Sequence, residues 1–401
     1  MRREALAFLA AAASLLVASS TAAQSSMAVP SPKSTKIDLP RLTKQANEGN
    51  TAAQFRLGVV YEFGRGVEKS AYEAMRWYRM AADRGDPAAE NNLGYLYETG
   101  PEGIKNPVEA ARWYRRAALY GTPEAQFNLG RLYLRGEGVQ KNEEEAVRWI
   151  RKAADADCAK AEAGLGMMYA VGQGVPQDLH EAYRLTRKAA KKGNPEAETN
   201  LGVFYDQGRG VAADAGEAKK WFEKAANAGV PEAQFGLGIL YERGRGVEKD
   251  PREAVRHYRL AAEQGLVKAQ TTLGEIYEIG VGVEKDYKES AKWYRQAFEA
   301  GDVASAMRLA AILFAGKGIA RDVPEAIKVW GWAADRGNAY AQFNLAQIYM
   351  SGTGVPRDLA KARSLLALAG KTLNVTKEMN DLSSLEGTSE MVETQPQETQ
   401  Y

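Results

Sequence analysis

The chain has 401 residues, of which 45% are hydrophobic, so it can bury a large core. Its 53 basic and 51 acidic residues leave a formal charge of +2, which gives no electrostatic reason to expect a nucleic-acid partner. A single cysteine, Cys158, excludes a disulfide within the chain.

The N-terminus departs from this mixed composition. Arg2 and Arg3 precede an apolar stretch over residues 5–17, and small residues follow it. This order of basic, apolar and small residues predicts a secretory signal peptide over residues 1–23, cleaved before Gln24. The alternative is an uncleaved membrane anchor, but the apolar stretch is short for spanning a bilayer.

Residues 24–37 are predicted to form a flexible linker behind the signal peptide. No later stretch of the sequence is long and apolar enough to span a bilayer. We therefore expect a periplasmic or secreted protein, with no stable membrane insertion of the mature chain.

The remainder of the chain repeats itself every 36 residues. A pair of leucine and glycine, later leucine and alanine, keeps the same step as a series of glycines. A fixed period of this length is typical of a solenoid of stacked repeats. The glycines on this grid are Gly49, Gly85, Gly121, Gly193, Gly229, Gly265, Gly301 and Gly337, with Asp157 in the single gap.

Each 36-residue unit is predicted to contain two helices, here called helix A and helix B. In the first unit, apolar residues from Ala53 to Tyr61 recur at helical spacing, and Gly64 and Gly66 then end helix A. Helix B begins at Ser70, a residue that caps helix N-termini, with Glu73 three positions later as in a capping box. The cap positions of the nine units are Ser70, Asn106, Asn142, Asp178, Asp214, Asp250, Asp286, Asp322 and Asp358.

The two ends of the array are less regular. Residues 38–49 are predicted to be a leading half-repeat, and nine full repeats follow over residues 50–370. Residues 371–386 are expected to form a capping helix, and the Ser-, Thr-, Glu- and Gln-rich residues 387–401 a disordered tail.

The order Ala-x-x-x-Leu-Gly-x-x-Tyr-x-x-Gly-x-Gly-Val, then Asp-x-x-x-Ala-x-x-Trp-Tyr-x-x-Ala-Ala-x-x-Gly, resembles the Sel1-like repeat, a relative of the tetratricopeptide repeat. The resemblance implies an all-α fold, a right-handed α/α superhelical solenoid of about nine 36-residue helix–turn–helix repeats, with helix A lining the concave face. Family members act as adaptors and regulators in bacterial signalling, envelope and host-interaction pathways. A signal peptide followed by such repeats is also similar to periplasmic regulators of exopolysaccharide synthesis.

The composition offers little for catalysis, so we expect no enzyme, no catalytic residue, no metal site and no cofactor. His257 takes the position of Trp77 in its repeat and is interpreted as a packing residue, while His180 takes a position that tolerates charge. Cys158 begins a helix A, where backbone N–H groups lower a thiol pKa and raise its reactivity. The alternative, which we favour, is an unreactive boundary residue.

The helix A face is the predicted binding surface. Asparagine recurs just before the Leu-Gly pair, and the matching asparagine of tetratricopeptide repeats faces the groove and binds a peptide backbone. One turn farther on, the side chains vary freely between repeats. We predict that a protein or peptide partner contacts Arg56, Asn92, Tyr95, Asn128, Arg131, Asn200, Arg308 and Asn344.

Two functions remain open from the sequence. The favoured one is an extracytoplasmic protein-binding scaffold or regulator, acting in envelope signalling. The alternative is an envelope factor that binds exopolysaccharide or peptidoglycan by stacking sugars on aromatic rings. Those rings would be Phe55, Tyr95, Phe127, Phe235 and Phe343.

Overall fold

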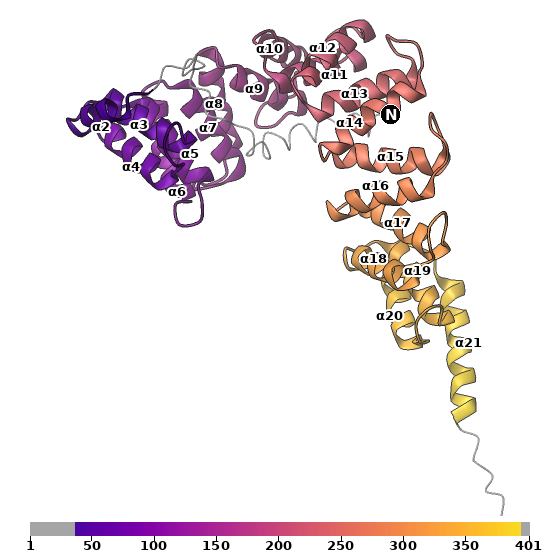
Figure 1. The fold of residues 1–401 in the computed structure, drawn as a ribbon. Coiled ribbons are helices and arrows are strands. Elements are labelled where there is room, and N and C mark those ends of the chain that lie inside the picture. Colours follow the sequence, from indigo (N-terminus) through magenta and orange to yellow (C-terminus); the bar gives the residue numbers. More distant parts are fainter. Residues whose placement is uncertain (1–36, 394–401) are drawn as a thin grey trace, which may run out of the picture. The chain divides into compact units, whose positions relative to one another are not determined.

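The computed structural model describes residues 37–393, so the predicted signal peptide and residues 24–36 lie outside the described residues. Between residues 37 and 393 the backbone forms twenty α-helices and no strand (Figure 1). None of these helices combines the length and the apolar character needed to cross a membrane. The fold is an all-α solenoid, as the sequence predicted. The chain divides into two compact units at residues 228 and 229, which we call unit 1 and unit 2.

Unit 1 begins with a single helix and continues with five helix pairs, repeats 1 to 5. The single helix is α2 (Leu39–Asn47). The A helices are α3 (Thr51–Phe63), α5 (Pro87–Thr99), α7 (Pro123–Arg135), α9 (Ala159–Val171) and α11 (Pro195–Gln207). The B helices are α4 (Ala71–Ala82), α6 (Pro107–Leu119), α8 (Glu143–Asp155), α10 (Leu179–Lys191) and α12 (Ala215–Asn227).

Unit 2 contains four further pairs, repeats 6 to 9, and a C-terminal helix. Its A helices are α13 (Pro231–Arg243), α15 (Val267–Ile279), α17 (Val303–Ala315) and α19 (Ala339–Ser351). Its B helices are α14 (Pro251–Glu263), α16 (Tyr287–Glu299), α18 (Val323–Asp335) and α20 (Leu359–Ala369), and α21 (Thr376–Glu393) follows.

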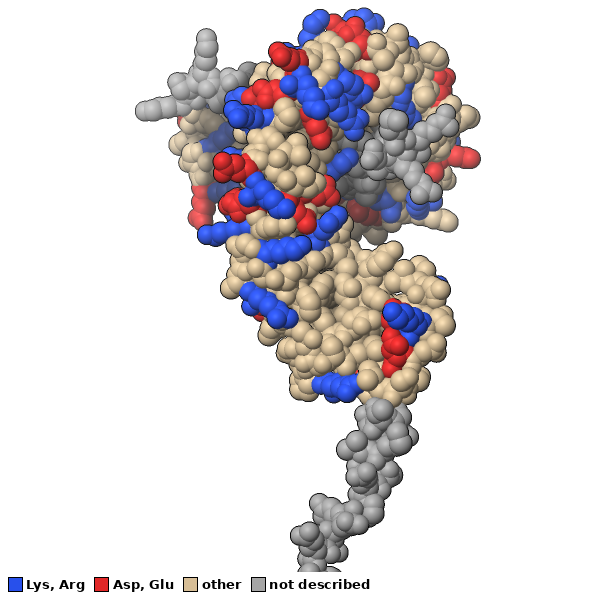
Figure 2. Space-filling view, turned by 90° about the vertical axis from the view of Figure 1, so that its right-hand side faces the viewer, with Lys and Arg blue, Asp and Glu red and all other residues tan. Residues whose placement is uncertain are grey.

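On the face shown in Figure 2, acidic and basic side chains are interspersed rather than gathered by sign, in keeping with the balanced composition.

The helices at the two ends pack on their neighbours through apolar side chains. Ala46 of α2 is buried in a cluster with Leu57 of α3, and Leu382 of α21 is buried in a cluster with Leu366 of α20. Helix α21 ends at Glu393, beyond residue 386 where the sequence placed the end of a capping helix.

Helix B starts where the sequence predicts, because the cap residue accepts a hydrogen bond in all nine repeats. In repeat 1 the Ser70 hydroxyl accepts from the backbone N–H of Glu73 at 3.2 Å. In a full capping box the side chain of Glu73 would accept a hydrogen bond from the backbone N–H of Ser70. That N–H donates instead to the carbonyl of Tyr61 at 2.9 Å. Glu73 pairs with Arg76, one turn farther along the helix. The capping-box prediction was therefore right for the cap and wrong for the glutamate.

Glycine in the Leu-Gly pair allows helix A to lie directly against an aromatic side chain of helix B. A Cβ atom on Gly58 would lie 2.4 Å from the ring of Tyr78, and one on Gly94 would lie 2.8 Å from the ring of Tyr114. These distances are shorter than any van der Waals contact, so only glycine fits without moving the ring.

Several neighbouring repeats meet at the second glycine of a Gly-x-Gly loop. A Cβ atom on Gly138 would lie 1.9 Å from the carbonyl oxygen of Pro107, the first residue of helix B in the preceding repeat. A Cβ atom on Gly210 would lie 2.0 Å from the carbonyl oxygen of Leu179, the first residue of helix B in repeat 4. Gly66, in repeat 1, has no atom within 4 Å. The loop of one repeat therefore rests on the helix of the repeat before it.

A second contact between repeats involves a polar residue in the first turn of helix A. Gln54 donates through Nε2 to the carbonyl oxygen of Ala46, at the end of the preceding helix, at 3.0 Å. In repeat 2 this position holds Glu90, which is fully buried and pairs with Arg116 at 2.8 Å. Burial raises the pKa of Glu90, although Arg116 opposes the shift. Equivalent amide bonds are made by Gln126, Gln270 and Gln342.

We expect Glu90→Gln to raise the free energy of unfolding at neutral pH by up to about 1 kcal/mol, because an amide replaces a desolvated carboxylate and can donate to the Ala82 carbonyl. A raised pKa means that folded Glu90 holds its proton more tightly than the unfolded chain does. Its destabilising effect is therefore full above the folded pKa, declines as the pH falls through it, and is gone below the pKa of glutamate in the unfolded chain. Thermal melts of both proteins at neutral and acid pH should converge on acidification. Gln126→Glu should show the opposite difference, and parallel curves for Glu90→Gln would contradict the assignment.

Candidate functional site

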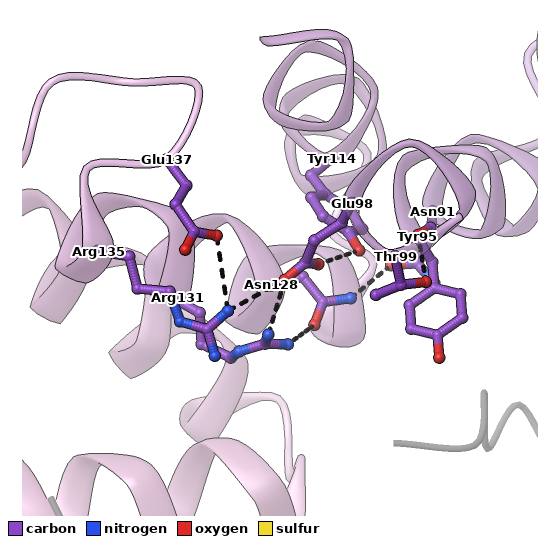
Figure 3. Close-up of polar contacts among 9 residues, drawn as sticks. All are labelled: Asn91, Tyr95, Glu98, Thr99, Tyr114, Asn128, Arg131, Arg135 and Glu137. Atoms are coloured by element: carbon purple, nitrogen blue, oxygen red, sulfur yellow. Dashed lines mark hydrogen bonds and ion pairs between the residues drawn. The ribbon is translucent and has the colours of Figure 1, made fainter. Parts of the chain in front are cut away.

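The helix A layer of repeats 2 and 3 carries a connected set of polar side chains. We call Asn91, Asn92, Glu98, Asn128, Arg131 and Arg135 the Asn–Arg network (Figure 3). The first three residues belong to α5 and the others to α7, so the network crosses from one repeat to the next.

The asparagines form the first half of this network. Asn91 donates through Nδ2 to the Oδ1 atom of Asn92 at 3.2 Å, and Asn128 donates to the Oδ1 atom of Asn91 at 3.1 Å. Arg131 donates through Nη1 to the Oδ1 atom of Asn128 at 3.2 Å. Each amide therefore has its orientation fixed by a neighbour, which prepares the surface before any partner arrives.

Glu98 is the centre of the second half. Its Oε1 atom accepts from Arg131 at 2.7 Å and from Arg135 at 3.4 Å, while its Oε2 atom accepts from the hydroxyl of Tyr114 at 2.8 Å. The side chains of the glutamate and both arginines are only 6–7% exposed. Burial raises the pKa of Tyr114. The pKa of Arg135 is lowered, mainly by burial and to a smaller extent by repulsion from Arg131.

The network reaches solvent along one edge. Tyr95 and Asn128 are half-buried, whereas Thr99 and Glu137 are exposed. Glu137 lies in the loop after α7, and its carboxylate is 3.6 Å from the Nη1 atom of Arg135. A partner lying across α5 and α7 would therefore meet an aromatic ring, an amide and a charged pair at this edge.

The structure brings together four of the eight residues predicted to bind a partner: Asn92, Tyr95, Asn128 and Arg131 lie in or beside the Asn–Arg network. Asn92 is 3% exposed, so its amide is available mainly to its neighbours.

The other four predicted residues lie elsewhere. Arg56 is exposed on α3, and Asn200 is buried on α11, two repeats beyond Asn128. Arg308, exposed on α17, and Asn344, half-buried on α19, belong to unit 2.

Comparison with known proteins identifies the repeats. The Sel1 repeat model matches nine consecutive segments within residues 51–371. The chain belongs to the Sel1 repeat family. The matched segments are residues 51–86, 87–119, 123–158, 159–194, 195–230, 231–266, 267–302, 303–338 and 339–371.

Two solved structures of Sel1-type repeat proteins resemble most or all of this chain. A Sel1 repeat protein from Oxalobacter formigenes is 31% identical, with a TM-score of 0.60 over 77% of this chain and 90% of that chain. The protective antigen c5321 of uropathogenic Escherichia coli strains is 26% identical, with a TM-score of 0.55 over 99% of this chain and 96% of that chain. No curated protein matches this sequence. Sel1 repeat proteins generally act as non-catalytic scaffolds for protein interactions.

Sequence reasoning missed Glu98 and Arg135, although the Sel1 repeats contain a signal for the glutamate. Wherever helix B carries tyrosine at the position of Tyr78, a glutamate stands 16 residues earlier and accepts its hydroxyl. The pairs are Glu62–Tyr78, Glu98–Tyr114, Glu242–Tyr258 and Glu278–Tyr294. In the other repeats the earlier position holds Leu134, Ala170, Asp206, Phe314 and Met350.

Other candidate groups are occupied in packing. His257 stacks on Tyr241 with ring centroids 5.4 Å apart, which agrees with its interpretation as a packing residue. Phe127 and Phe235 are 9% and 3% exposed, so they present little ring surface to a sugar. Residues 37–385, whose side chains the structure describes, contain no cluster of three potential metal ligands.

The reactive-thiol hypothesis for Cys158 is not supported. Its side chain is half-buried at the N-terminus of α9, and burial raises the pKa of the thiol, outweighing the backbone N–H of Ala161, which lowers it. A thiol with a raised pKa is a weaker nucleophile at neutral pH. The structure therefore favours the alternative, an unreactive residue at a helix boundary.

Proposed function

We propose that this Sel1 repeat protein is an extracytoplasmic scaffold or regulator, and that it binds a protein or peptide on the helix A face of repeats 2 and 3. The observation that carries the proposal is the Asn–Arg network. It joins positions that vary between repeats into one preorganised surface, while the framework positions around it stay constant. A constant framework with variable side chains on one face is how solenoids acquire a specific partner.

The half-buried side chains at the edge of the network are suited to contact a partner. Asn128 has both a donor and an acceptor group, which an extended backbone can use. Tyr95 adds contact area at a small cost in side-chain entropy. Asn92 is proposed to orient these contacts rather than to make them, because it is buried.

Affinity capture from an envelope extract with the mature chain, followed by mass spectrometry, tests this function. We expect the double variant Tyr95→Ala and Asn128→Ala to lose affinity for the captured protein by about tenfold or more, at two contacts of roughly 0.5–1.5 kcal/mol each. The control is Asn344→Ala with Gln347→Ala, at the same repeat positions in unit 2. Equal binding by parent and Tyr95–Asn128 variant would place the partner elsewhere.

The extracytoplasmic location rests on the predicted signal peptide. We expect the mature protein to begin near Gln24 and to appear in the periplasmic or secreted fraction. N-terminal sequencing of the purified protein measures this directly. Soluble cytoplasmic protein that still begins at Met1 would refute export.

A further inference from the structure

Two guanidinium groups lie one helical turn apart on α7, at Arg131 and Arg135 (Figure 3). Both side chains are 7% exposed, and Arg135 borders the exposed edge of the Asn–Arg network at Glu137. Within unit 1 this pair of cations is specific to repeat 3. The corresponding pairs of residues in repeats 1, 2, 4 and 5 are Val59 and Phe63, Tyr95 and Thr99, Met167 and Val171, and Val203 and Gln207.

The two arginines meet carboxylates of different kinds. Glu98 is buried, binds both guanidinium groups and is held in place by Tyr114. Glu137 stands on an exposed loop, with its side chain 47% exposed, and approaches Arg135 only to 3.6 Å. Glu137 therefore holds Arg135 through one long contact from an exposed loop, which a better-placed carboxylate can replace.

Arg131 retains an unused donor. Its Nε atom is buried and has no hydrogen-bond partner within the described part of the chain. Arg131, Arg135 and Glu98 together carry one net positive charge, which a single monovalent anion balances. A carboxylate also matches the planar, two-pronged donor pattern of a guanidinium group.

We propose that the partner inserts the carboxylate of an aspartate or glutamate side chain at Arg131 and Arg135, where it displaces Glu137. The inference rests on the proposed function and names the chemistry of the partner, an acidic segment in extended conformation. The segment's backbone lies against Asn128 and Tyr95 while its carboxylate reaches the arginines. Glu137 acts as a placeholder for that carboxylate in the free protein.

The test is selection of random dodecapeptides displayed on phage against the full mature chain, followed by binding of synthetic peptides measured by fluorescence anisotropy. We expect the selected peptides to share one acidic position. Changing that residue to its amide should weaken binding by about tenfold or more, since a charge-assisted hydrogen bond to a buried arginine is lost.

Three variants define the site. Arg135→Gln should abolish the preference for the acidic peptide over its amide form. Glu137→Gln should tighten binding of the acidic peptide, because it removes the competing carboxylate. Arg148→Gln, which removes the same charge from the exposed face of helix B in the same repeat, should leave binding unchanged.

The outcomes separate the inference from the proposed function. The selected peptides could bind equally well in acidic and amide forms, yet bind more weakly to the Tyr95–Asn128 variant than to the parent. That result would refute the proposal that the partner supplies a carboxylate, and it would leave the proposed scaffold function intact. Failure to select any peptide would count against both. If Arg135→Gln does not fold, Glu137→Gln decides alone, because it changes an exposed loop residue, and unchanged or weaker binding by it would refute the inference.

Discussion

Replacing Glu98 with leucine should lower the free energy of unfolding by about 3–5 kcal/mol, the usual cost of removing one partner from a buried ion pair. The change removes the carboxylate that accepts hydrogen bonds from the guanidinium groups of Arg131 and Arg135 and from the hydroxyl of Tyr114. These three buried groups are then left without that acceptor. Urea denaturation of the full chain, followed by the helical circular dichroism signal, measures the loss in the transition of unit 1.

The next repeat shows how apolar side chains can fill the same positions. In the next repeat the positions of Glu98 and Tyr114 hold Leu134 and Ile150, both buried. Combining Glu98→Leu with Tyr114→Ile, Arg131→Met and Arg135→Val, which are the residues found one repeat later at each position, should recover most of the lost stability. Apolar residues of similar volume often replace a buried ion pair without cost. If the quadruple variant is as unstable as the single one, the loss of partners for these polar groups is not the cause.

Gly138→Ala should destabilise unit 1 by about 2–5 kcal/mol. Two effects add: an alanine in the left-handed region costs roughly 1–2 kcal/mol, and overpacking costs roughly 1–3 kcal/mol more. The φ angle of Gly138 is +68°, and its Cβ atom would lie 1.9 Å from the carbonyl oxygen of Pro107. The melting temperature and the urea midpoint of the full chain both report the change.

Gly66→Ala is the matched control for this prediction. Gly66 occupies the same position in the loop of repeat 1, with a φ angle of +77° and no neighbouring atom within 4 Å. It should show the backbone cost alone. Equal losses in the two variants would mean that the contact between the loop and the preceding helix contributes nothing to stability.

The regular part of the structure could be predicted because the same local chemistry occurs nine times. Ser70 and its eight counterparts all cap helix B, as the sequence predicted. The glutamate of the predicted capping box failed for a physical reason. The carbonyl of Tyr61 already accepts the N–H that Glu73 was expected to bind.

The Asn–Arg network was predicted only in part, because it depends on residues that do not repeat. Asn92, Tyr95, Asn128 and Arg131 stood out by their place on helix A. Glu98 lies 33 residues before Arg131, close to the period but off it, so comparison of equivalent positions could not pair them. A search for partners between neighbouring repeats would have found what a search for shared residues missed.

The Glu98–Arg131 pair also bears on how such an array can grow by gene duplication. The Gly-x-Gly loop of a duplicated repeat would contact the preceding helix B at the same position as in the original, so an extra repeat generally finds its contacts in place. Repeat 3 is different, because a tandem copy would set its second Arg131 against Leu134 instead of Glu98. That copy would bury a guanidinium group against leucine. Selection against this arrangement would preserve the number and order of repeats at this junction while the rest of the array remained open to change.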